Sequence, residues 1–421
     1  MNWDESLQHA EVSDIGMRRA TNQDAYEVVL ASDDETWRRR GHLFVVADGM
    51  GAHAAGELAS EMAVSGIALR YFKYEELDAA EALHKAILDT NTEVYQRGQA
   101  NLDFYNMGTT VSVLALVPQG ALIAHVGDSR VYRLRRQQLD QLTFDHSLVW
   151  ELRSSGQLSQ DSELARVVPK NIITRSVGPN ANVHPDLEGP FPIEVGDTFL
   201  LCSDGLSGPV QDNEIGAILA SFSPPEAAQA LVDLANLRGG PDNITALVVR
   251  VTGDAIATRH AAMEMEVANH KPAPRPVHSA VWITAGVGAL GAIALSLTEQ
   301  RLWAVVAAII ALGALGVAAL QRWVLGALVV EAPKPRRYGK GPHTSIHAEV
   351  DRAFLDELGT IAGELRAAAI DEKWEVDLTH FDSLRQQAKQ MAEDGQNVDA
   401  LRCFTHAISS MMTELRRQNR R

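Results

Sequence analysis

Cysteine is scarce in this 421-residue chain, and positive charge is in deficit. The two cysteines, Cys202 and Cys403, cannot form the disulfide framework of a small secreted domain, so we expect a reduced, intracellular protein. There are 38 Lys and Arg against 54 Asp and Glu, for a formal net charge of −16. This balance argues against nucleic acid as a partner, because phosphate backbones bind clustered Lys and Arg. The acidic N-terminus, Met1–Ser6, has no apolar core, so we expect no signal peptide.

Three aspartates stand at the edges of apolar runs that are typical of buried strands. Asp48 follows an apolar run ending at Ala47, Asp204 follows a run ending at Cys202, and Asp242 precedes the run Ile244–Val251. An Asp-Gly pair by itself is an ordinary turn. Three carboxylates that converge from separate strand ends, with glycines beside them, suit a hard divalent cation.

Short strands and amphipathic helices alternate up to about residue 252. The turn Pro118–Gly120 joins two apolar strands and predicts an antiparallel hairpin, and the close spacing of the strands favours packed antiparallel sheets over a parallel one. The expected strands are Glu11–Ile15, Leu43–Ala47, Thr109–Val117, Ala121–His125, Arg130–Leu134, Thr198–Cys202 and Ile244–Val251. The expected helices are Gly56–Phe72, Asp78–Arg97, Ser147–Ser155 and Pro225–Asn236.

A proline-rich linker separates this region from two uncharged apolar runs, Ser279–Leu297 and Leu302–Leu320. Each run is long enough to cross a bilayer core of ~30 Å, and both are rich in Gly and Ala. We therefore expect a transmembrane hairpin, the alternative being a buried helical hairpin in a soluble protein. Basic residues flank the pair, with Arg301 alone in its loop, so both flanks are expected in the cytoplasm, at the inner or plasma membrane. The flanking basic residues are Arg275, Lys334, Arg336, Arg337 and Lys340.

The last 90 residues are polar and helical. Apolar residues from Val350 to Leu365 recur at steps of three and four, and two further helices, 381–394 and 397–417, are joined at Gly395. Ala400, Phe404 and Ala407 match the spacing of the second helix of a tetratricopeptide-like hairpin, but a single match favours an ordinary helical hairpin with a packed interior. The expected organisation is 1–252 as a first domain, 253–278 as linker, 279–330 as membrane hairpin and 331–421 as a cytoplasmic α-helical tail. The tail would bind a partner protein or hold the first domain near its target.

Several motifs in the first 250 residues, taken in order, resemble the metal-dependent PPM (PP2C) protein phosphatases in their bacterial form. The resemblance covers nearly the whole first domain. It rests on Ser13–Asp24, Asp48–Gly51, Gly108–Thr110, His125–Arg130, Leu142–Ser147, Ile173–Gly178, Asp204–Leu206 and Gly240–Thr245. It implies an α+β fold, a four-layer α-β-β-α sandwich with the metal site at one edge of the paired sheets.

The resemblance also implies roles for individual residues. Asp48 would bridge two Mn²⁺ or Mg²⁺ ions, Asp204 and Asp242 would complete one, and the Gly49 carbonyl would bind the other. A water or hydroxide bridging two such ions can attack phosphorus in line while the ions neutralise the phosphoryl oxygens. Arg19 would hold the phosphate with its guanidinium fork, whereas the adjacent Arg18 is expected to be a surface charge. Asp24 would orient metal-bound water, and Asp128 would help bind a third ion.

Three positions depart from the family pattern. Gln23 stands where glutamate is frequent, which removes one charge. Met50 stands where animal members carry a histidine that looks like the general acid, so another group must protonate the leaving group. Gly208 replaces an aspartate of the third metal site, which leaves Asp128 with either a metal role or a structural role in the turn 127–130.

Three histidines and one further segment also have expected roles. His53, His125 and His146 lack metal-ligand spacing, so packing or turn hydrogen bonds are expected for each. The segment 148–170 resembles the flap that lies beside the active site in the family.

Together, the resemblance and the apolar hairpin predict a membrane-anchored phosphoserine and phosphothreonine phosphatase. Its expected partners are phosphoproteins, including a Ser/Thr kinase or the substrates of that kinase. One alternative is a catalytically silent phosphatase-like adaptor that binds phosphoproteins. A second is a phosphatase of non-protein phosphate esters.

Overall fold

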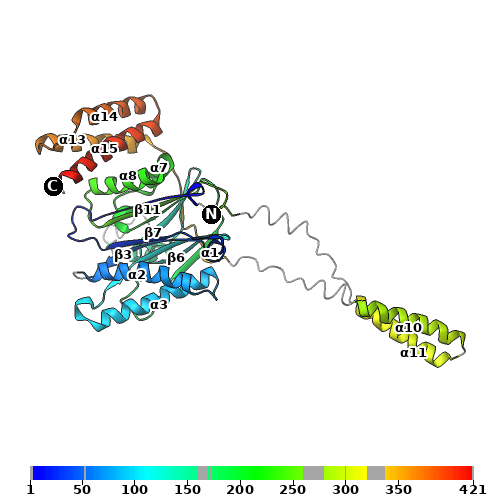
Figure 1. Ribbon diagram of the computed structural model, residues 1–421. Coiled ribbons are helices and arrows are strands. Elements are labelled where there is room, and N and C mark those ends of the chain that lie inside the picture. Colours follow the sequence, from blue (N-terminus) through cyan, green and yellow to red (C-terminus); the bar gives the residue numbers. More distant parts are fainter. Residues whose placement is uncertain are drawn as a thin grey trace. The chain divides into compact units, whose positions relative to one another are not determined.

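Two packed β-sheets form the centre of the protein (Figure 1). The computed structural model describes residues 3–51, 54–158, 169, 172–258, 279–298, 300–319 and 337–419. These residues fall into two compact units, residues 1–258 together with 337–421, and residues 259–336. The C-terminal tail, expected as a region of its own, therefore belongs to the same unit as the first domain.

The first sheet has six strands, and each strand is antiparallel to its neighbours. In order across the sheet they are β1 (Leu7–Asp14), β11 (Ile244–Val251), β10 (Thr198–Cys202), β7 (Arg130–Arg135), β8 (Gln138–Gln141) and β12 (Thr344–His347). The last of these comes from the tail, so the tail completes one edge of this sheet.

The second sheet lies face to face with the first. Its strands are β2 (Asp24–Val29), β3 (His42–Met50), β5 (Val111–Val117), β6 (Gly120–Val126) and β9 (Asp186–Phe191), with β4 (Gly108–Thr109) pairing with the end of β3. The predicted hairpin is present, because Val117 lies opposite Gly120 in the β5–β6 ladder. Alternate residues of these strands, including Phe44, Val46 and Leu114, pack against Phe199 and Leu247 of the first sheet.

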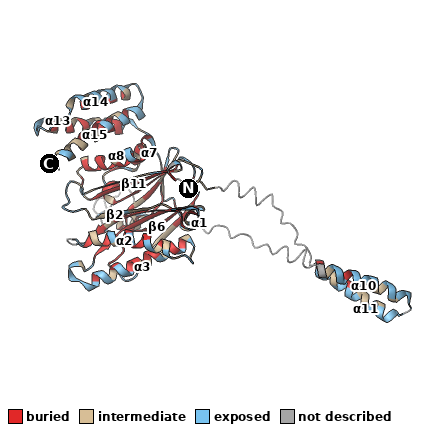
Figure 2. Cartoon of the chain, viewed as in Figure 1, coloured by how far each residue is buried: buried red, intermediate tan, exposed pale blue. Residues whose placement is uncertain are grey.

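Helices cover the outer face of each sheet, and the strands between them are the most buried part of the chain (Figure 2). On the second sheet lie α2 (Ala55–Lys73) and α3 (Ala79–Ala100), and on the first lie α7 (Asp212–Ser221) and α8 (Pro224–Leu237). Smaller helices are η1 (Trp3–Glu5), α1 (Asp34–Arg40), η2 (Leu102–Phe104), α4 (Leu148–Ser154) and α6 (Asp204–Ser207). The predicted α+β sandwich of two sheets between helical layers is confirmed.

Three tail helices form a further layer over α7 and α8 (Figure 1). They are α13 (Arg352–Asp371), α14 (Leu378–Glu393) and α15 (Asn397–Asn419). Their apolar stripes, which include Phe354, Leu358 and Phe404, join one continuous core with the side chains of α7 and α8. Ala400 and Ala407 are fully buried, as the sequence spacing of this helix predicts.

The second unit is a helical hairpin of α10 (Ser279–Leu297) and α11 (Arg301–Ala319). The helices pack closely at Gly288, where a Cβ atom would lie 3.1 Å from the Ala307 carbonyl oxygen. Within the described residues, one stretch, Arg301–Ala318, is long and apolar enough to cross a membrane, and the apolar part of α10, Val281–Leu297, is shorter than such a span. Two transmembrane helices are therefore not confirmed.

Candidate functional site

Antiparallel pairing brings Asp24 and Asp48 together at one edge of the second sheet. Asp24 begins β2 directly opposite Asp48, which lies near the end of β3. The Asp48 backbone is fixed on its other side, where its N–H donates to Thr110 Oγ1 (3.0 Å) and its carbonyl accepts from Thr109 Oγ1 (2.9 Å). The buried strand therefore delivers a carboxylate at a defined position.

Asp204 and Asp242 come from the other sheet. Asp204 opens α6 immediately after β10, and Asp242 lies in the turn before β11. These segments can approach because residue 205 is a glycine, since a Cβ atom there would lie 2.0 Å from the Asn243 carbonyl oxygen. The three aspartates predicted from the strand ends thus face one another at the edge shared by both sheets.

Burial and mutual repulsion raise the pKa values of four aspartates at this edge, Asp24, Asp48, Asp128 and Asp204. Burial raises the pKa of Asp48 well above its usual value, and the charges of Asp24, Asp204, Asp128 and Asp242 raise it further. Burial is also the main cause that raises the pKa of Asp204, with the charge of Asp242 adding to it. The pKa values of Asp24 and Asp128 are both raised to about 7, again chiefly by burial. Neighbouring acids are held in a site that disfavours their charged forms.

The cluster fits divalent cations. Asp24, Asp128 and Asp204 each have a buried Oδ1 atom that accepts no hydrogen bond from a described residue. Unpaired carboxylate oxygens of this kind suit hard cations such as Mg²⁺ and Mn²⁺. Within the described residues, no three His, Cys, Asp or Glu side chains are arranged to hold an ion by themselves. Water and a backbone carbonyl such as that of Gly49 would have to complete each coordination shell.

Arg19 reaches this cluster from the loop after β1. Its Nη2 atom lies 2.6 Å from Asp242 Oδ2, and its side chain is 48% exposed, so the guanidinium is accessible at the rim of the site. The adjacent Arg18 is exposed and forms no hydrogen bond or ion pair with a described residue. The structure therefore places Arg19 beside the predicted metal ligands, and it leaves Arg18 at the surface.

Asn243 positions the Arg19 loop, and the sequence interpretation had not singled it out. Its Nδ2 atom donates to the carbonyl oxygens of Ile15 and Thr21, both at 2.9 Å, and its Oδ1 accepts from the Gln23 N–H at 2.8 Å. One buried amide thus ties together both ends of the loop that carries Arg19. The signal in the sequence was its place directly after Asp242.

Asp24 is held by two hydroxyl groups that sequence reasoning also missed. Ser203 Oγ and Thr245 Oγ1 each donate to Asp24 Oδ2 at 2.7 Å. Ser203 precedes Asp204, so the residue that orients Asp24 is the neighbour of another cluster member. Because both hydroxyl groups bind Oδ2, they fix the orientation of the carboxylate and therefore the direction of its free Oδ1 atom.

The two described histidines of the sequence analysis make hydrogen bonds within the fold. His125 is fully buried, with Nδ1 2.9 Å from Ser112 Oγ and Nε2 2.8 Å from the Gly127 carbonyl oxygen, and burial lowers its pKa to about 3. His146 accepts from the Gly127 N–H through Nδ1 and contacts Asp186 through Nε2. This agrees with the expected role in turns. His53 lies outside the described residues.

The structure also locates Met50 and Gly208, where the chain departs from the family pattern, and Asp128, whose role Gly208 affects. Asp128 is buried in the turn between β6 and β7, but its Oδ1 atom forms no hydrogen bond with a described residue of that turn. Gly208 is exposed at the end of α6, and Met50 ends β3. Of the expected flap, α4 and residues up to 158 are described, together with 169, and the remainder lies outside the described residues.

Comparison with known proteins matches this arrangement to one family. Residues 17–236 match the family model described as protein phosphatase 2C. The chain is 38% identical over 247 residues to the serine/threonine phosphatase stp of Listeria monocytogenes, covering 57% of this chain and 95% of that protein. It is 37% identical over 243 residues to protein phosphatase PhpP of Streptococcus pneumoniae, covering 56% of this chain and 95% of that protein.

A solved structure with bound metal is also similar. The catalytic domain of the serine/threonine protein phosphatase PstP, solved in complex with two manganese ions, is 33% identical, with a TM-score of 0.51. The match covers 59% of this chain and 99% of that one. The chain belongs to the protein phosphatase 2C family, whose members use Mn²⁺ or Mg²⁺, and it is a protein serine/threonine phosphatase.

Proposed function

We propose that the protein hydrolyses phosphoserine and phosphothreonine with two divalent ions held at the edge of its paired sheets. Asp48, Asp204, Asp242 and the Gly49 carbonyl would be the ligands. One observation carries this proposal: partly buried carboxylates meet here from four separate segments, three of them have an unpaired buried oxygen, and their pKa values are raised. A cluster of this kind is destabilising unless cations neutralise it.

The residues around the ions have separate roles. When bound, two ions would activate a water molecule and neutralise charge on the phosphoryl group. Arg19 would bind phosphoryl oxygens with its exposed guanidinium and hold the ester in line. Asp24, fixed through Ser203 and Thr245, would orient water in the site with its free oxygen. Asp128, with its own unpaired oxygen, is the candidate for a third ion, although Gly208 supplies no carboxylate to share it.

Hydrolysis of a phosphothreonine peptide by the full-length chain tests this function. We expect turnover with Mn²⁺ or Mg²⁺, no turnover with EDTA, and loss of turnover in Asp48→Asn with the chain still folded by circular dichroism. Turnover that persists in EDTA would contradict the metal mechanism. A folded wild-type chain without turnover on the peptide or on p-nitrophenyl phosphate would favour the silent adaptor, and turnover on the small ester alone would favour a non-protein substrate.

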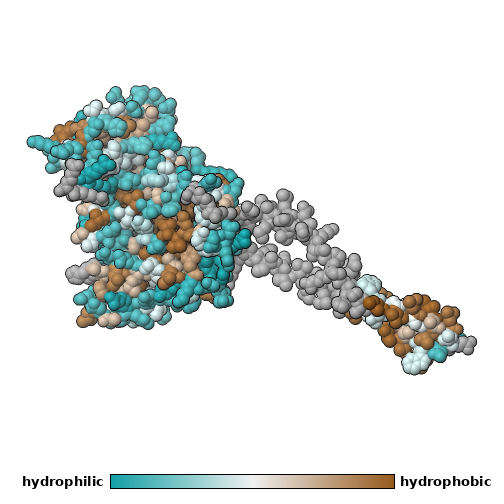
Figure 3. Space-filling view, in the orientation of Figure 1, coloured by the Kyte–Doolittle hydropathy of each residue, from teal (hydrophilic) through white to brown (hydrophobic). Residues whose placement is uncertain are grey.

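We also propose that the α10–α11 hairpin anchors the enzyme in a membrane, with both flanking regions in the cytoplasm. The hairpin displays its apolar side chains outward, including Leu290 (70% exposed), Leu297 (82%) and Leu302 (76%), and the space-filling view shows the same hydrophobic surface (Figure 3). An apolar surface of this extent needs a partner or a lipid environment.

Membrane fractionation tests the anchor. We expect the full-length chain in the membrane fraction, resistant to carbonate extraction and released by detergent. Replacing Leu290 and Ile309 on the exposed hairpin surface with glutamate should move it to the soluble fraction. Recovery of the unchanged chain as a soluble protein would contradict the anchor. A membrane-bound phosphatase would be well placed to oppose a Ser/Thr kinase, and loss of the enzyme should then raise phosphorylation of that kinase or its substrates.

A further inference from the structure

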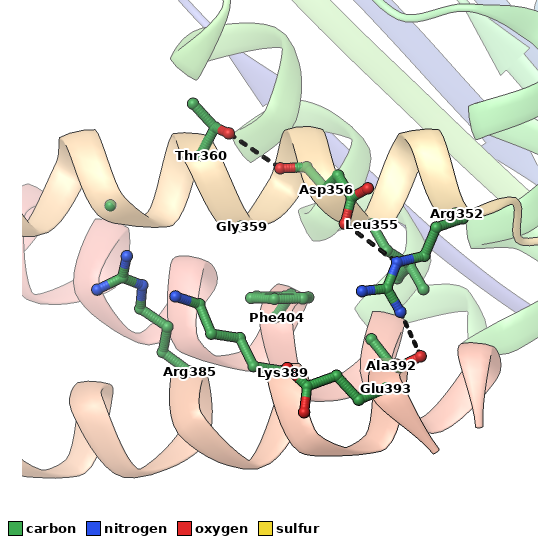
Figure 4. A pocket seen from close by; sticks show the side chains of 11 residues that line it. Arg352, Leu355, Asp356, Gly359, Thr360, Arg385, Lys389, Ala392, Glu393 and Phe404 are labelled. Atoms are coloured by element: carbon green, nitrogen blue, oxygen red, sulfur yellow. Dashed lines mark hydrogen bonds and ion pairs between the residues drawn. The ribbon is translucent and has the colours of Figure 1, made fainter. Parts of the chain in front are cut away.

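A groove of about 450 Å³ lies between the three tail helices, far in sequence from the catalytic motifs (Figure 4). Helix α13 forms one wall with Gly359 and Gly363, α14 forms the other with Arg385 and Lys389, and Phe404 of α15 lies at the floor. This volume is within the range of ~300–1,000 Å³ that is usual for ligand sites.

Two glycines keep the α13 wall free of side chains. Gly359 and Gly363 are four residues apart and therefore on the same face of the helix. A Cβ atom on Gly359 would make ordinary contact with Phe404 Cζ at 3.4 Å, whereas one on Gly363 would lie 2.9 Å from Arg385 Nη2. Glycine disfavours a helix interior, yet both glycines stand where side chains would fill the groove. The absence of side chains on this wall lets the Phe404 ring and the Arg385 guanidinium approach the helix closely.

The opposite wall carries two basic side chains that have no ion-pair partner among the described residues. Arg385 and Lys389 lie one turn apart on α14, and both side chains reach across the groove towards α13 (Figure 4). Neither forms a hydrogen bond or ion pair with a described residue, and Arg385 Nε is buried without a partner. Asp382, whose charge reaches Arg385, is already bound by both Nε and Nη2 of Arg366.

Other arginines of the tail, unlike Arg385, do have ion-pair partners. Arg352, at the far end of the groove, is held by Asp356 and by the Ala392 carbonyl oxygen. Arg416 on α15 lies 2.7 Å from Asp233. Two carboxylates, Asp356 and Glu393, also line the groove. Asp356 is paired with Arg352, and Glu393 forms no ion pair with a described residue, so Arg385 and Lys389 remain available to an anionic ligand.

We propose that this groove binds an extended peptide segment of a partner protein, with an anionic side chain between Arg385 and Lys389 and the peptide backbone along Gly359 and Gly363. The shared ligand chemistry is a phosphate or carboxylate group on a peptide. The net negative charge of the chain disfavours anionic polymers such as nucleic acid, so a short segment with few charges is the better match. The binding of an anionic peptide does not depend on the proposed function. The identification of the partner protein as a phosphoprotein does rest on it.

Fluorescence anisotropy on the full-length chain tests the groove. Three labelled peptides would differ at one position only, which holds phosphothreonine, glutamate or threonine. The chain would carry Arg19→Ala and Asp48→Asn and be kept in EDTA, so that the catalytic site neither hydrolyses nor holds the phosphate. We expect the phosphothreonine or the glutamate peptide to bind about tenfold or more tightly than the threonine peptide.

Matched variants separate the groove from the rest of the surface. Lys389→Glu should weaken binding by about tenfold or more, whereas Arg417→Glu, the same charge change at an exposed position of α15, should leave it unchanged. Gly359→Leu should block binding without any change of charge, and because leucine favours a helix, the melting temperature should not fall.

The outcomes are distinct. Preference for the phosphothreonine peptide identifies a phosphate as the ligand, and equal binding of the glutamate peptide identifies a carboxylate. Equal binding of all three peptides, or equal effects of Lys389→Glu and Arg417→Glu, would overturn the proposal. A separate assay tests the proposed function. If the unsubstituted chain does not hydrolyse p-nitrophenyl phosphate with Mn²⁺, the proposed function is wrong, whatever the peptide-binding result.

Discussion

Arg19 brings an exposed positive charge to a site composed mainly of carboxylates, so we expect it to contribute to catalysis and not to stability. Arg19→Ala should lower kcat/KM for a phosphothreonine peptide by about 100-fold, because a charged donor to the phosphoryl group is lost. The melting temperature should hardly change, since the ion pair with Asp242 is half exposed (48% and 30%). Steady-state kinetics and a thermal melt check both parts.

Arg18 supplies the matched control. It is exposed and has no ion pair with a described residue, so Arg18→Ala should retain the kinetics of the parent chain. If both variants lost activity equally, a general electrostatic effect would explain the loss, and the specific role of Arg19 would be wrong.

His42 links the acid stability of the fold to one buried ring. It lies between Trp3 and Trp37, its Nδ1 accepts the Ala31 N–H at 3.0 Å, and burial lowers its pKa to about 4. The unfolded chain takes up this proton at about 6.5. Stability should therefore fall as pH falls from about 6.5 to 4, with this residue contributing up to about 3 kcal/mol.

Urea unfolding between pH 7 and 4 measures this dependence. His42→Asn keeps an acceptor but cannot be protonated, so its stability should vary less with pH over that window than the stability of the parent chain. An identical pH dependence in both proteins would exclude His42 as a source of acid sensitivity.

Residue types and their order predicted most of the candidate site, but not its supporting contacts. Asp48, Asp204 and Asp242 could be found because each stands where an apolar strand ends. Asn243, Ser203 and Thr245 could not be recognised, because their roles depend on which atoms face Asp24 and the Arg19 loop in three dimensions. The unpaired oxygens and raised pKa values likewise arise only when both sheets are packed.

At the level of elements, Arg416 joins the end of the tail to the body of the phosphatase. Its Nη2 atom lies 2.7 Å from the fully buried Asp233 of α8, and its Nε atom lies 3.6 Å from Asp14 at the end of β1. Arg416→Ala would leave Asp233 buried without its cation. The free energy of unfolding should fall by about 2–4 kcal/mol.

Denaturant titration with Arg417→Ala as the control tests this connection. Arg417 is the exposed neighbour on the same helix turn, and its loss should change stability by less than about 0.5 kcal/mol. Because Asp14 also accepts the Gly16 N–H at the base of the Arg19 loop, we expect Arg416→Ala to raise KM as well. Equal stability of both variants would show that the tail end is not coupled to α8.

Long helices and strands with continuous apolar runs were predictable, whereas strands that are short or partly polar were not. Helices α2, α3, α8 and the tail helices carry sustained apolar periodicity, and β5 and β6 are continuous apolar runs. The sequence analysis missed β2, β8, β9 and β12. These strands are short or half exposed, and their polar residues offer little alternation, so their partners determine them.

At the scale of the whole molecule, the chain leaves the phosphatase unit at Thr258 and returns to it at Arg337. After the return, β12 pairs with β8, and Ala348 packs on α7 where Gly216 has no side chain, since a Cβ there would lie 2.6 Å from that of Ala348. The tail is thus part of the phosphatase core. The hairpin of α10 and α11 is an insertion into that unit and not a spacer before a separate domain.

A chain that ends at Thr258 should therefore fold less stably than the full-length protein. It loses β12 and the tail helices, which exposes the apolar side of α7 and α8, and it loses the ion pair of Arg238 with Glu357. It should still fold, because the related PstP catalytic domain corresponds to only 59% of this chain. We expect the melting temperature to fall by about 10 °C or more, as a loss of several kcal/mol implies.

Gly216→Val in the full-length chain provides the complementary test. It should displace the segment at Ala348 that follows β12, while every tail residue remains present. Differential scanning calorimetry of both proteins distinguishes two arrangements. If both melt at lower temperatures than the parent chain, the tail stabilises the phosphatase through its docked position. If the shortened chain melts as the parent does, the tail would instead be an independent module, and binding in its groove could act on the enzyme only by bringing a partner near.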